Sequence, residues 1–463
     1  MDRVQFVVIG AGPAGEAAAF KARELDATVA VVDRLWFGGS CPHIGCVPSK
    51  SLLHSAAVHH AGGAEPWSKA SARRDFMVNR APDAEAPDDT GHVKALETAG
   101  ARTVRGAARI VGKGRVEVDG PDGTVTLEGD NVIVATGSSS KVPPIDGLAE
   151  TKPWTNRQAT LTRELPRSLL VLGGGPTGVE LAQVFARFGV PTTVCQSGPR
   201  ILPTDHIRNA EAITAALLRD GVILRTGARA QRARAGQGAA GAHVVELDDG
   251  TTVEGHVILL AVWRDLGLDG LGLEHYGLDA SKRDGVPHDG RLRVADGLWM
   301  AGDAAGPELH THQGHYQGEL AVRMALGDDV RPDYRALPRA TYTDPEAASV
   351  GVTLDQAREA GLDAFELVAD FAKTAKGYSV EAEFGHVTIV VDRATRELAG
   401  ASMAVPDASA AIHECVLAIK ARVPIETLAE TIHAFPSTSR ILNGLFADAR
   451  RELNTPGSVV KAG

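Results

Sequence analysis

Two cysteines separated by four residues are the most reactive feature of this sequence. Cys41 and Cys46 lie in the segment GGSCPHIGCVPSK, residues 38–50, and the chain has only four cysteines among 463 residues. So few cysteines cannot form the disulfide framework of a secreted protein, and a close pair therefore predicts redox or metal chemistry. Cys-x4-Cys is not a usual zinc spacing and no second ligand pair accompanies it, so we expect no metal site. A structural disulfide is the remaining alternative.

Two stretches that can position this pair share one order of elements: an apolar strand, a glycine-rich turn, an alanine-rich helix and a second strand. They are residues 7–33 and residues 169–196, and each is predicted to form a βαβ unit. Parallel strands joined by a crossover helix require a sheet covered by helices. The sequence therefore predicts an α/β fold with two Rossmann-like nucleotide-binding domains.

The first unit carries a dinucleotide-binding pattern. Gly10, Gly12 and Gly15 form GxGxxG directly between a strand and a helix. The first glycine permits the tight turn, the second lets the backbone approach a pyrophosphate, and the third lets helix and strand pack closely. Asp33 closes the second strand, where a carboxylate can bind an adenosine ribose hydroxyl. The alternative is a glycine-rich turn without a ligand, but the strand context and the terminal acid favour a dinucleotide.

The second unit repeats the glycines but not the acid. Gly173, Gly175 and Gly178 form the same pattern, and Gln196 ends the second strand. A carboxylate there would repel a 2′-phosphate whereas Gln196 would not, and Arg200 lies nearby as a possible phosphate partner. We therefore expect NADPH, with NADH also possible. In the alternative interpretation Gln196 binds a ribose hydroxyl and Arg200 is a surface residue.

The rest of the chain alternates between strand and helix patterns. Residues 101–129 are predicted to form short antiparallel strands, and apolar strands return at 257–261 and 298–301. After residue 335, strand-like segments at 384–391 and 397–404 precede helical ones at 407–421 and 424–431. This order predicts a separate α+β domain at the C-terminus.

Composition excludes several classes of protein. The net charge is −10 and no dense Lys/Arg run is present, so we expect no nucleic-acid partner. No apolar run approaches the roughly 18 residues of a membrane helix, so we expect no membrane partner. The N-terminus enters a strand at once, without the pattern of a signal peptide, which predicts a cytoplasmic protein.

The motifs taken together resemble the flavoprotein disulfide reductases, the family of dihydrolipoamide dehydrogenase, glutathione reductase and mercuric reductase. A GxGxxG unit followed by GG(S/T)CxxxxCxPSK is typical of that family. Three further motifs agree, and they are Ala135-Thr136-Gly137, Ala301-Gly302-Asp303 and Thr343-Asp344-Pro345-Glu346. The stretch from His312 to Gly318 also resembles the helix beneath the flavin.

The resemblance implies a domain order and a set of cofactor contacts. The expected domains are an FAD-binding domain in two parts (1–150 and 276–334), an NAD(P)-binding domain (151–275) and an interface domain (335–463) of a homodimer. Besides the residues of the first unit, the residues expected to contact FAD are Gly39, Ser40, Lys50, Thr136, Gly137, Gly302, Asp303 and His312.

The same resemblance assigns roles around the dithiol. Cys46 would be the thiol next to the flavin, and Cys41 would exchange with substrate. A helix that begins here would favour the thiolate. Lys50 and Glu180 fall where the family has an ion pair near the flavin.

The C-terminal segment departs from the family pattern. The family has His-Pro-Thr-x-x-Glu, in which the histidine is the acid–base for the partner subunit's dithiol. Aligned on the proline, this chain has Phe435 at the base position and Arg440 at the orienting position. Phenylalanine cannot transfer a proton. His433, two residues earlier, is the alternative base, and Arg440 could stabilise a thiolate, bind an anionic group of the substrate or form an ordinary interface salt bridge.

A phenylalanine at the base position is similar to the variant in 2-ketopropyl-coenzyme M oxidoreductase/carboxylase. The sequence therefore predicts an FAD-dependent NAD(P)H oxidoreductase that reduces or cleaves a small disulfide or thioether through Cys41 and Cys46. The alternatives are a diaphorase-like reductase of quinones, electrophiles or metals, and reductive C–S cleavage coupled to carboxylation. A non-catalytic subunit of a larger complex is a third class.

Overall fold

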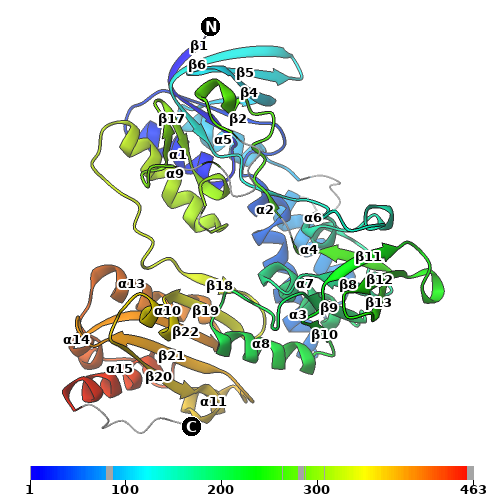
Figure 1. Cartoon of the computed structure of the whole chain (residues 1–463), viewed down its shortest axis with the longest axis vertical. Helices are drawn as coiled ribbons and strands as arrows, with labels where there is room; N and C mark the ends of the chain where they lie inside the picture. Colours follow the sequence, from blue (N-terminus) through cyan, green and yellow to red (C-terminus); the bar gives the residue numbers. More distant parts are fainter. Residues whose placement is uncertain are drawn as a thin grey trace.

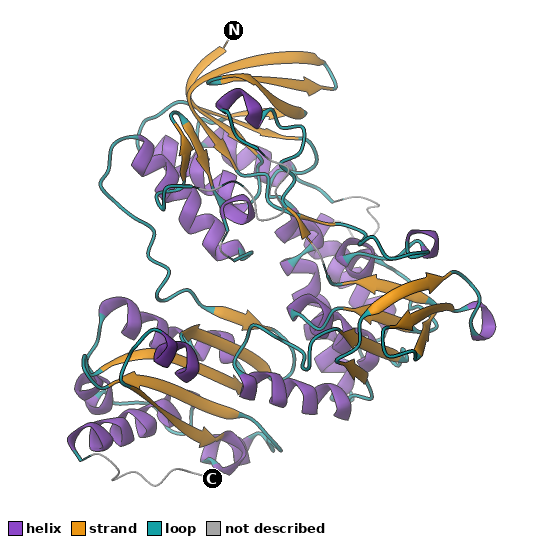
Figure 2. Ribbon diagram, viewed as in Figure 1, coloured by secondary structure: helices purple, strands orange, loops and turns teal. Residues whose placement is uncertain are grey.

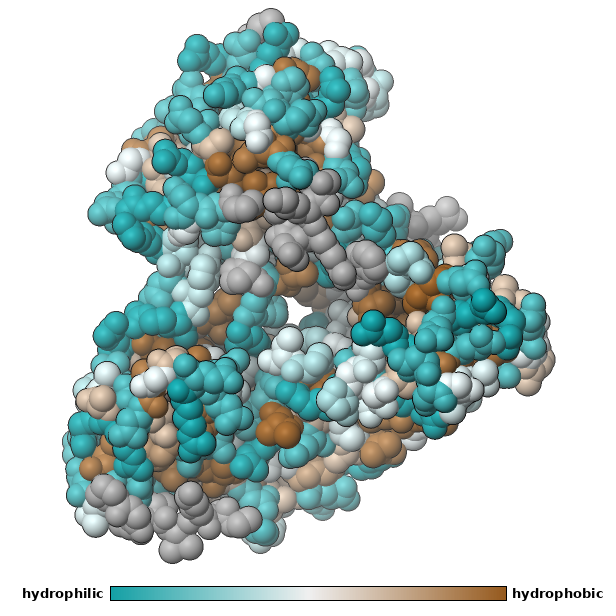
Figure 3. All heavy atoms as spheres, in the orientation of Figure 1, coloured by the Kyte–Doolittle hydropathy of each residue, from teal (hydrophilic) through white to brown (hydrophobic). Residues whose placement is uncertain are grey.

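The structure is a computed structural model of the whole chain. It describes residues 2–455 except 80–86, 263, 280–285, 287 and 307, so residues 456–463 of the predicted interface domain lie outside the described part. Figure 1 shows three sheet-containing parts: one around β1 (Asp2–Ile9), one around β8 (Leu169–Leu172) and one around β22 (Glu397–Val405). The face seen in Figure 3 is hollowed at its centre, where the three parts meet.

The first sheet has eight strands and is built on the first βαβ unit. Its main path is β16-β17-β6-β1-β2-β3, and β4 and β5 extend from β6. The other strands are β2 (Val29–Asp33), β3 (Arg102–Arg105), β4 (Ala107–Gly112), β5 (Arg115–Gly120), β6 (Gly123–Val134), β16 (Arg293–Ala295) and β17 (Leu298–Met300). The strands β17, β6, β1 and β2 run parallel, so their carboxyl ends lie at one edge.

The expectation for residues 101–129 was partly wrong. The strands β4, β5 and β6 are antiparallel as expected, but β3 pairs parallel with β2. Helix α5 (Thr90–Thr98) provides the connection that brings the chain back to the start of β3. The short polar run Arg102–Arg105 thus ends the parallel sheet, whereas alternation alone predicts a hairpin.

Small side chains allow the two helices of this part to pack closely. Helices α1 (Pro13–Glu24) and α9 (Thr311–Ala325) cross each other, and a Cβ at Gly318 of α9 would overlap the carbonyl oxygen of Ala14 in α1. The buried face of α1 consists of alanines and one glycine. Close approach of the two helices joins the first βαβ unit to a segment nearly three hundred residues later.

The second sheet is parallel, with the order β10-β9-β8-β14. Its elements are β9 (Thr192–Gln196), β10 (Ile223–Thr226), β14 (Val257–Leu260), α7 (Pro176–Arg187) and α8 (Ile207–Arg219). A three-stranded antiparallel sheet adjoins it, formed by β11 (Ala230–Arg234), β12 (His243–Leu247) and β13 (Thr252–Gly255). Both predicted βαβ units are therefore present.

The cysteine segment forms helices that lie against the second sheet. The segment itself forms α2 (Ser40–Ile44) and the start of α3 (Cys46–His60), and the other helices of this group are α4 (Trp67–Asn79) and, much later in the sequence, α6 (Asn156–Leu161). Leu52 and Leu53 of α3 share one buried cluster with Val179 and Phe185 of α7. Figure 1 accordingly shows α3 beside α7. The helix that carries the dithiol thus packs on the helix of the second nucleotide unit.

The C-terminal part is an α+β domain, as predicted. Its sheet has the order β18-β19-β22-β21-β20 and is antiparallel throughout. The strands are β18 (Arg339–Thr341), β19 (Glu346–Gly351), β20 (Ala364–Asp370) and β21 (His386–Asp392). The helices are α10 (Leu354–Glu359), α11 (Ala375–Ser379), α12 (Ala408–Ala411), α13 (His413–Ala421), α14 (Ile425–Glu430) and α15 (Thr438–Asn454), and Figure 2 shows them along the sheet.

The remaining elements are short. They are the strand pair β7 (Ser139–Ser140) and β15 (Arg264–Asp265), and the 3-10 turns at Ala149–Thr151, Ala239–Gly241, Leu273–Tyr276, Gly302–Ala305 and Phe371–Lys373. In the described part of the chain, no helix is both long and apolar enough to cross a bilayer.

One face of α7 holds the interface domain in place. Gln183 bonds to both backbone groups of Asp344, and Arg187 bonds to the Asp344 carboxylate at 2.8 Å. Arg187 also donates to the buried carboxylate of Asp220 at 2.8 Å. Gln183 and Arg187 therefore link the second nucleotide unit to the interface domain, and the buried pair with Asp220 holds the Arg187 side chain in position.

We expect Arg187→Ala to lower the melting temperature markedly. The change removes the cation closest to the buried carboxylate of Asp220, and removing one partner of a buried ion pair typically costs about 3–5 kcal/mol. Arg3→Ala, which breaks an exposed pair with Asp130, is the control and should cost less than about 1 kcal/mol. Equal melting temperatures for the two variants would contradict a structural role for the buried pair.

Candidate active site

The first and third glycines of both nucleotide loops are required by the backbone. Gly10 has φ +104° and Gly173 has φ +113°, a region that only glycine adopts readily. A Cβ at Gly15 would overlap the carbonyl oxygen of Gly10, and one at Gly178 would overlap that of Gly173. These four glycines let each helix begin directly against its strand.

The second glycines leave room for a ligand. Gly12 and Gly175 are the N-caps of α1 and α7, and neither helix receives a hydrogen bond from a capping side chain. A Cβ at Gly175 would have no neighbour within 4 Å, whereas one at Gly39 would lie 2.6 Å from Cα of Gly12. The free N–H groups of a helix start suit a pyrophosphate. The loop of Gly39 and Ser40 borders the first cradle, so these residues fit a dinucleotide there.

The residues that end the second strands make the same contact in both units. Asp33 accepts from the Ala11 N–H at 2.9 Å, and Gln196 accepts from the Gly174 N–H at 2.9 Å. Asp33 also accepts from the N–H groups of Leu35 and Trp36. Burial raises the pKa of Asp33 although these N–H groups oppose the shift. Each side chain thus holds its glycine loop in shape.

Arg200 does not extend toward the second cradle in this structure. Its guanidinium donates to the carbonyl oxygens of Leu202, Pro203 and Asp205, which lie in its own loop. A phosphate contact would require it to leave some of these three acceptors.

The remaining residues expected at FAD gather at one edge of the first sheet. Thr136 and Gly137 follow β6, and Gly302 and Asp303 follow β17, so they meet the glycine loop after β1. Ligands in open α/β sheets bind beyond the carboxyl ends of the strands. The Gly302 N–H donates to the Gln317 side chain at 2.8 Å, and Asp303 accepts from the Ser138 hydroxyl. These contacts tie α9 to the cradle.

The dithiol lies where two helices meet. Cys41 is in α2 and Cys46 is the first residue of α3, and both are thiols in this structure. A hydrogen bond from Cys41, the Thr311 hydroxyl at 3.5 Å and the charge of Lys50 together lower the pKa of Cys46 to about 6, against the effect of burial. The hydrogen bond to Cys46 and burial raise the pKa of Cys41. The first thiolate of the pair is therefore on Cys46.

The ion pair expected between Lys50 and Glu180 is present. Lys50 Nζ lies 2.8 Å from the Glu180 carboxylate and 4.4 Å from the centroid of the Tyr342 ring. Glu180 also accepts from the Tyr342 N–H at 2.9 Å. Burial alone would lower the pKa of Lys50, but the Glu180 carboxylate raises it, so the ammonium persists beside Cys46. The pair joins the dithiol helix, α7 and the interface domain.

We expect Lys50→Met to raise the pKa of Cys46. The ammonium stabilises the thiolate, and an opposite charge within about 4–6 Å typically shifts a pKa by about 1–3 pH units. The thiolate would then form at a pH at least about one unit higher than in the wild type. The pH dependence of iodoacetamide alkylation of the reduced protein measures this, with Lys373→Met, at an exposed lysine, as the control. An unchanged alkylation profile in Lys50→Met would contradict the assignment.

His433 is held inside its own subunit. Its Nε2 lies 2.6 Å from the Glu414 carboxylate and its Nδ1 lies 2.8 Å from the Thr431 carbonyl oxygen. The side chain is only 6% exposed. Both ring nitrogens are therefore engaged by oxygens of the same chain. Such a ring clamps the segment and has no free nitrogen for another thiol.

Phe435 and Ile432 are the large apolar side chains that this segment presents outward. Phe435 is 73% exposed, and the neighbouring Ile432 is 97% exposed. Arg440, in the first turn of α15, donates to the Asn443 side chain. Figure 1 shows α15 and α2 in different parts of the molecule. Phe435 and Arg440 would therefore meet a dithiol only across a subunit boundary.

His312 points to the linker between domains in this structure. It lies 2.8 Å from the Pro338 carbonyl oxygen and stacks on His310, with ring centroids 5.1 Å apart. Burial lowers the pKa of His312. The residue of α9 that contacts the dithiol is its neighbour Thr311. Among the described residues, no group of three or more His, Cys, Asp or Glu could hold a metal ion.

Sequence reasoning missed several residues of the site. Thr311, Tyr342 and Glu414 contact predicted residues from distant segments, and a hydroxyl, a ring or a carboxylate at those places has no local signal. Gln317 was noted only as part of a motif. Its contact with Gly302 depends on the packing of α9 against α1.

Two dinucleotide cradles around a dithiol define a flavin-linked oxidoreductase. A family model described as pyridine nucleotide-disulphide oxidoreductase matches residues 4–318, and the dimerisation domain of the same family matches residues 337–444. The chain therefore belongs to the pyridine nucleotide-disulphide oxidoreductases. The family uses FAD and a pyridine nucleotide, and its dimerisation domain supports a homodimer.

Relatives of known identity align over nearly the whole chain. Dihydrolipoyl dehydrogenase from Chlorobaculum tepidum is 31% identical and covers 96% of this chain and 97% of its own length. The dihydrolipoyl dehydrogenase from Thermus scotoductus is 33% identical and covers 95% of this chain and 96% of its own length. Among solved structures, the HOCl-induced flavoprotein disulfide reductase RclA from Escherichia coli, as a Cu(II) complex, has a TM-score of 0.86 at 27% identity, over 96% and 99%. LpdA from Mycobacterium tuberculosis has a TM-score of 0.84 at 28% identity, over 97% and 99%.

Proposed function

We propose that the protein uses NAD(P)H and FAD to keep Cys41 and Cys46 reduced, and that this dithiol reduces a small disulfide or cleaves a thioether without a histidine acid. The observation that carries the proposal is the contrast between the two halves of the site. The thiolate of Cys46 is stabilised by Cys41, Thr311 and Lys50, whereas the segment expected to serve the partner's dithiol presents Phe435.

The residues of this chain divide the work between two cradles. Bound FAD would supply the hydride acceptor for the nicotinamide and the two-electron reductant for the Cys41–Cys46 disulfide. The α1 cradle would hold the pyrophosphate of FAD, and the α7 cradle that of the nicotinamide nucleotide. Lys50 and Glu180 stand between the α7 cradle and the dithiol. Lys50 holds a positive charge beside the thiolate of Cys46.

The exchange step balances without an external acid. The reduced pair holds one proton, on Cys41, and one negative charge, on Cys46. Cys41 passes its proton to Cys46 and attacks one substrate sulfur, and the first product leaves as a thiolate that takes this proton from Cys46. Cys46 then attacks Cys41, which re-forms the disulfide and releases the second product as a thiolate. Cys46 is the group within hydrogen-bond reach of the Cys41 proton. Because the second product leaves as a thiolate, the favoured substrates are those whose thiols are acidic.

NADPH is the proposed donor. The support is Gln196, which presents no carboxylate to a 2′-phosphate at the end of β9. Arg200 adds support only if it leaves its own loop. NADH therefore remains the alternative donor.

The proposal is tested by anaerobic titration of the purified protein with NADPH and, separately, NADH. We expect a long-wavelength absorbance band from the thiolate next to oxidised flavin, complete at about two electrons per flavin and at lower concentration with NADPH. The dithiol relay would be overturned if the flavin bleached directly and a thiol count after reduction showed that Cys41 and Cys46 had not gained their two thiols. If the band were complete at a lower concentration of NADH than of NADPH, only the choice of donor would be overturned.

A second candidate is a reductase of quinones or of metal ions such as Cu(II), in which the pair only stores electrons. The observation that favours it is the lack of an acid at Phe435, joined with the similarity to RclA, which was solved as a Cu(II) complex. Cys41→Ser distinguishes the two candidates. Quinone and Cu(II) reduction should persist in the variant under the second candidate, whereas disulfide reduction should be lost under the first.

A further inference from the structure

A polar row crosses the interface sheet on the face that α8 covers. Arg339, Ser349, Ser402 and Thr388 are direct cross-strand partners on β18, β19, β22 and β21. Direct partners in an antiparallel sheet project from one face with Cβ atoms about 5 Å apart, so the four side chains form a line. Polar groups buried beneath a helix each need a hydrogen-bond partner.

One buried hydroxyl in this row has no hydrogen-bond partner among the residues that the structure describes. Thr388 lies 2.8 Å from His386, and the other nitrogen of His386 lies 2.8 Å from Asn209 of α8. Ser402, by contrast, is only 3% exposed and its Oγ has no hydrogen bond. A buried hydroxyl left without a partner costs about 1–3 kcal/mol. A water or a bound ligand in the adjoining space would remove this cost.

The side chain of His206, at the start of α8, does not provide the missing hydrogen bond to Ser402. His206, the N-cap of α8, accepts from the Arg208 N–H at 3.2 Å through Nδ1. Its Nε2 faces the Glu366 carboxylate at 3.3 Å. Both ring nitrogens of His206 therefore already have partners, and the space between His206 and the polar row stays open.

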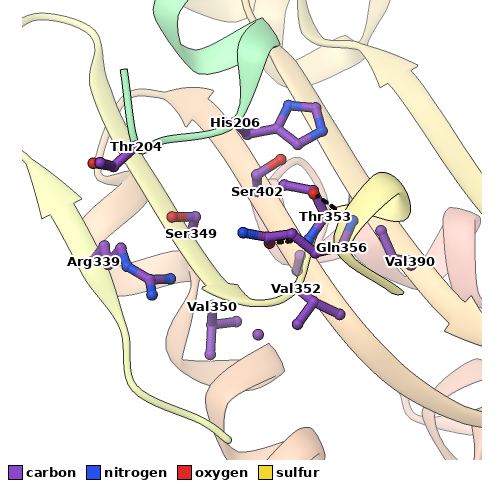
Figure 4. Close-up of a pocket in the computed structure, with 12 residues that line it drawn as sticks. Thr204, His206, Arg339, Ser349, Val350, Val352, Thr353, Gln356, Val390 and Ser402 are labelled. Carbon is purple, nitrogen blue, oxygen red and sulfur yellow. Dashed lines mark hydrogen bonds between the residues drawn. The ribbon is translucent and has the colours of Figure 1, made fainter. Parts of the chain in front are cut away.

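That space is a cavity of about 40 Å³ at the junction of the second nucleotide unit and the interface domain. A water needs roughly 10–15 Å³ of such volume, so the cavity holds about three waters or one small ligand. The side chains that matter most for recognition are Thr204, His206, Arg339, Ser349, Gln356 and Ser402. Figure 4 shows them around one space, with the amide of Gln356 directed toward Ser349.

The free polar groups around the cavity are mainly donors. The Gln356 oxygen accepts from the Thr353 N–H in a capping box, so its amide nitrogen is the end left for a ligand. Arg339 donates to Glu308 through Nε and Nη2. This ion pair leaves the Nη1 group of Arg339 to donate to a ligand. The hydroxyls of Ser349 and Ser402 can donate as well. Such a set matches an acceptor with several oxygens.

We propose that this cavity is a binding site for a small oxyanion: phosphate, sulfate or a carboxylate. Arg339 supplies the positive charge, and Gln356, Ser349 and Ser402 supply neutral donors. The nearby carboxylates are already paired, Glu308 with Arg339 and Glu366 with His206 and Arg208. A ligand held here contacts both domains, so its binding strengthens their docking.

The test is the melting temperature of the FAD-loaded enzyme in phosphate, sulfate or acetate, against chloride at equal ionic strength. The key variant is Gln356→Glu, because glutamate preserves the capping box while replacing the amide donor by a carboxylate. The matched control is Gln158→Glu, the same change in the exposed capping box of Thr155 in α6. Ser402→Ala removes the unpartnered hydroxyl without adding bulk.

We expect the wild type and Gln158→Glu to melt roughly 1–2 °C higher when the anion is at ten times its Kd. Gln356→Glu should weaken binding at least about tenfold, because it places a like charge at the site. Ser402→Ala should weaken it by a smaller factor. A response to phosphate and sulfate alone would identify a tetrahedral ligand, and a response to acetate alone a carboxylate. An equal response in Gln356→Glu, or no response in the wild type, overturns the site.

Discussion

Cys46→Ser is expected to reduce disulfide reductase activity by about 10³-fold or more, a loss typical of removing a nucleophile. The variant has neither the stabilised thiolate beside Thr311 and Lys50 nor the second sulfur that re-forms the disulfide. It should also show no long-wavelength band in an anaerobic titration. The flavin itself should still be reduced by the nucleotide, because the two cradles are untouched.

The matched control is Cys195→Ala. Cys195 is a buried thiol of β9 that packs in the second domain and has no contact with the dithiol in the structure as described. Burial raises its pKa to about 11, so it takes no part in thiolate chemistry. Activity should stay within a fewfold of the wild type. Comparable losses in both variants would mean that cysteine replacement damages the fold and not the relay.

Phe435→His is expected to raise the reduction of aliphatic disulfides by about 10²-fold, the lower end of general acid catalysis. Aliphatic thiols are poor leaving groups and need a proton, whereas an aromatic disulfide releases a stable thiolate. The gain should therefore be small for an aromatic disulfide. Arg440→Glu in addition would give the new histidine a carboxylate to orient it, and the gain should grow.

Phe435→Leu distinguishes the effect of an added proton donor from the effect of a changed side-chain shape. It removes the ring without adding an acid, so it should bring no gain with aliphatic substrates. If Phe435→His and the double variant also show none, another group already supplies the proton. Glu414→Gln then becomes informative, because it loosens His433 from the carboxylate that clamps it.

The sequence by itself predicted the fold class and most of the cofactor cradles. Glycines at fixed spacing between a strand and a helix leave few backbone solutions, and Gly10 and Gly173 indeed adopt positive φ. The cysteine motif and the interface domain are equally local patterns. Such features are readable because the chemistry of each depends on residues within about one turn or one strand of each other.

Predictions that depended on distant segments were less complete. The pattern of residues 101–129 did not reveal that β3 pairs parallel with β2, because pairing direction is decided by the helix before it. The proximity of Arg200 in sequence suggested a phosphate contact, but in the folded loop its guanidinium turns to three carbonyl oxygens. Proximity along the chain does not determine where a long side chain points.

What the sequence determined was the class of chemistry: two nucleotide cradles and a pair of cysteines near a helix start. Tertiary structure alone decided the electrostatics of that chemistry and the existence of the polar row. Thr311 reaches Cys46 from α9, while Glu180 of α7 and Tyr342 of the interface domain hold Lys50 beside it. The buried hydroxyl of Ser402 likewise lies in its polar row only because four strands pair side by side. Charge and hydrogen bonding act through space over a few ångströms, so their effects appear only once the chain has folded.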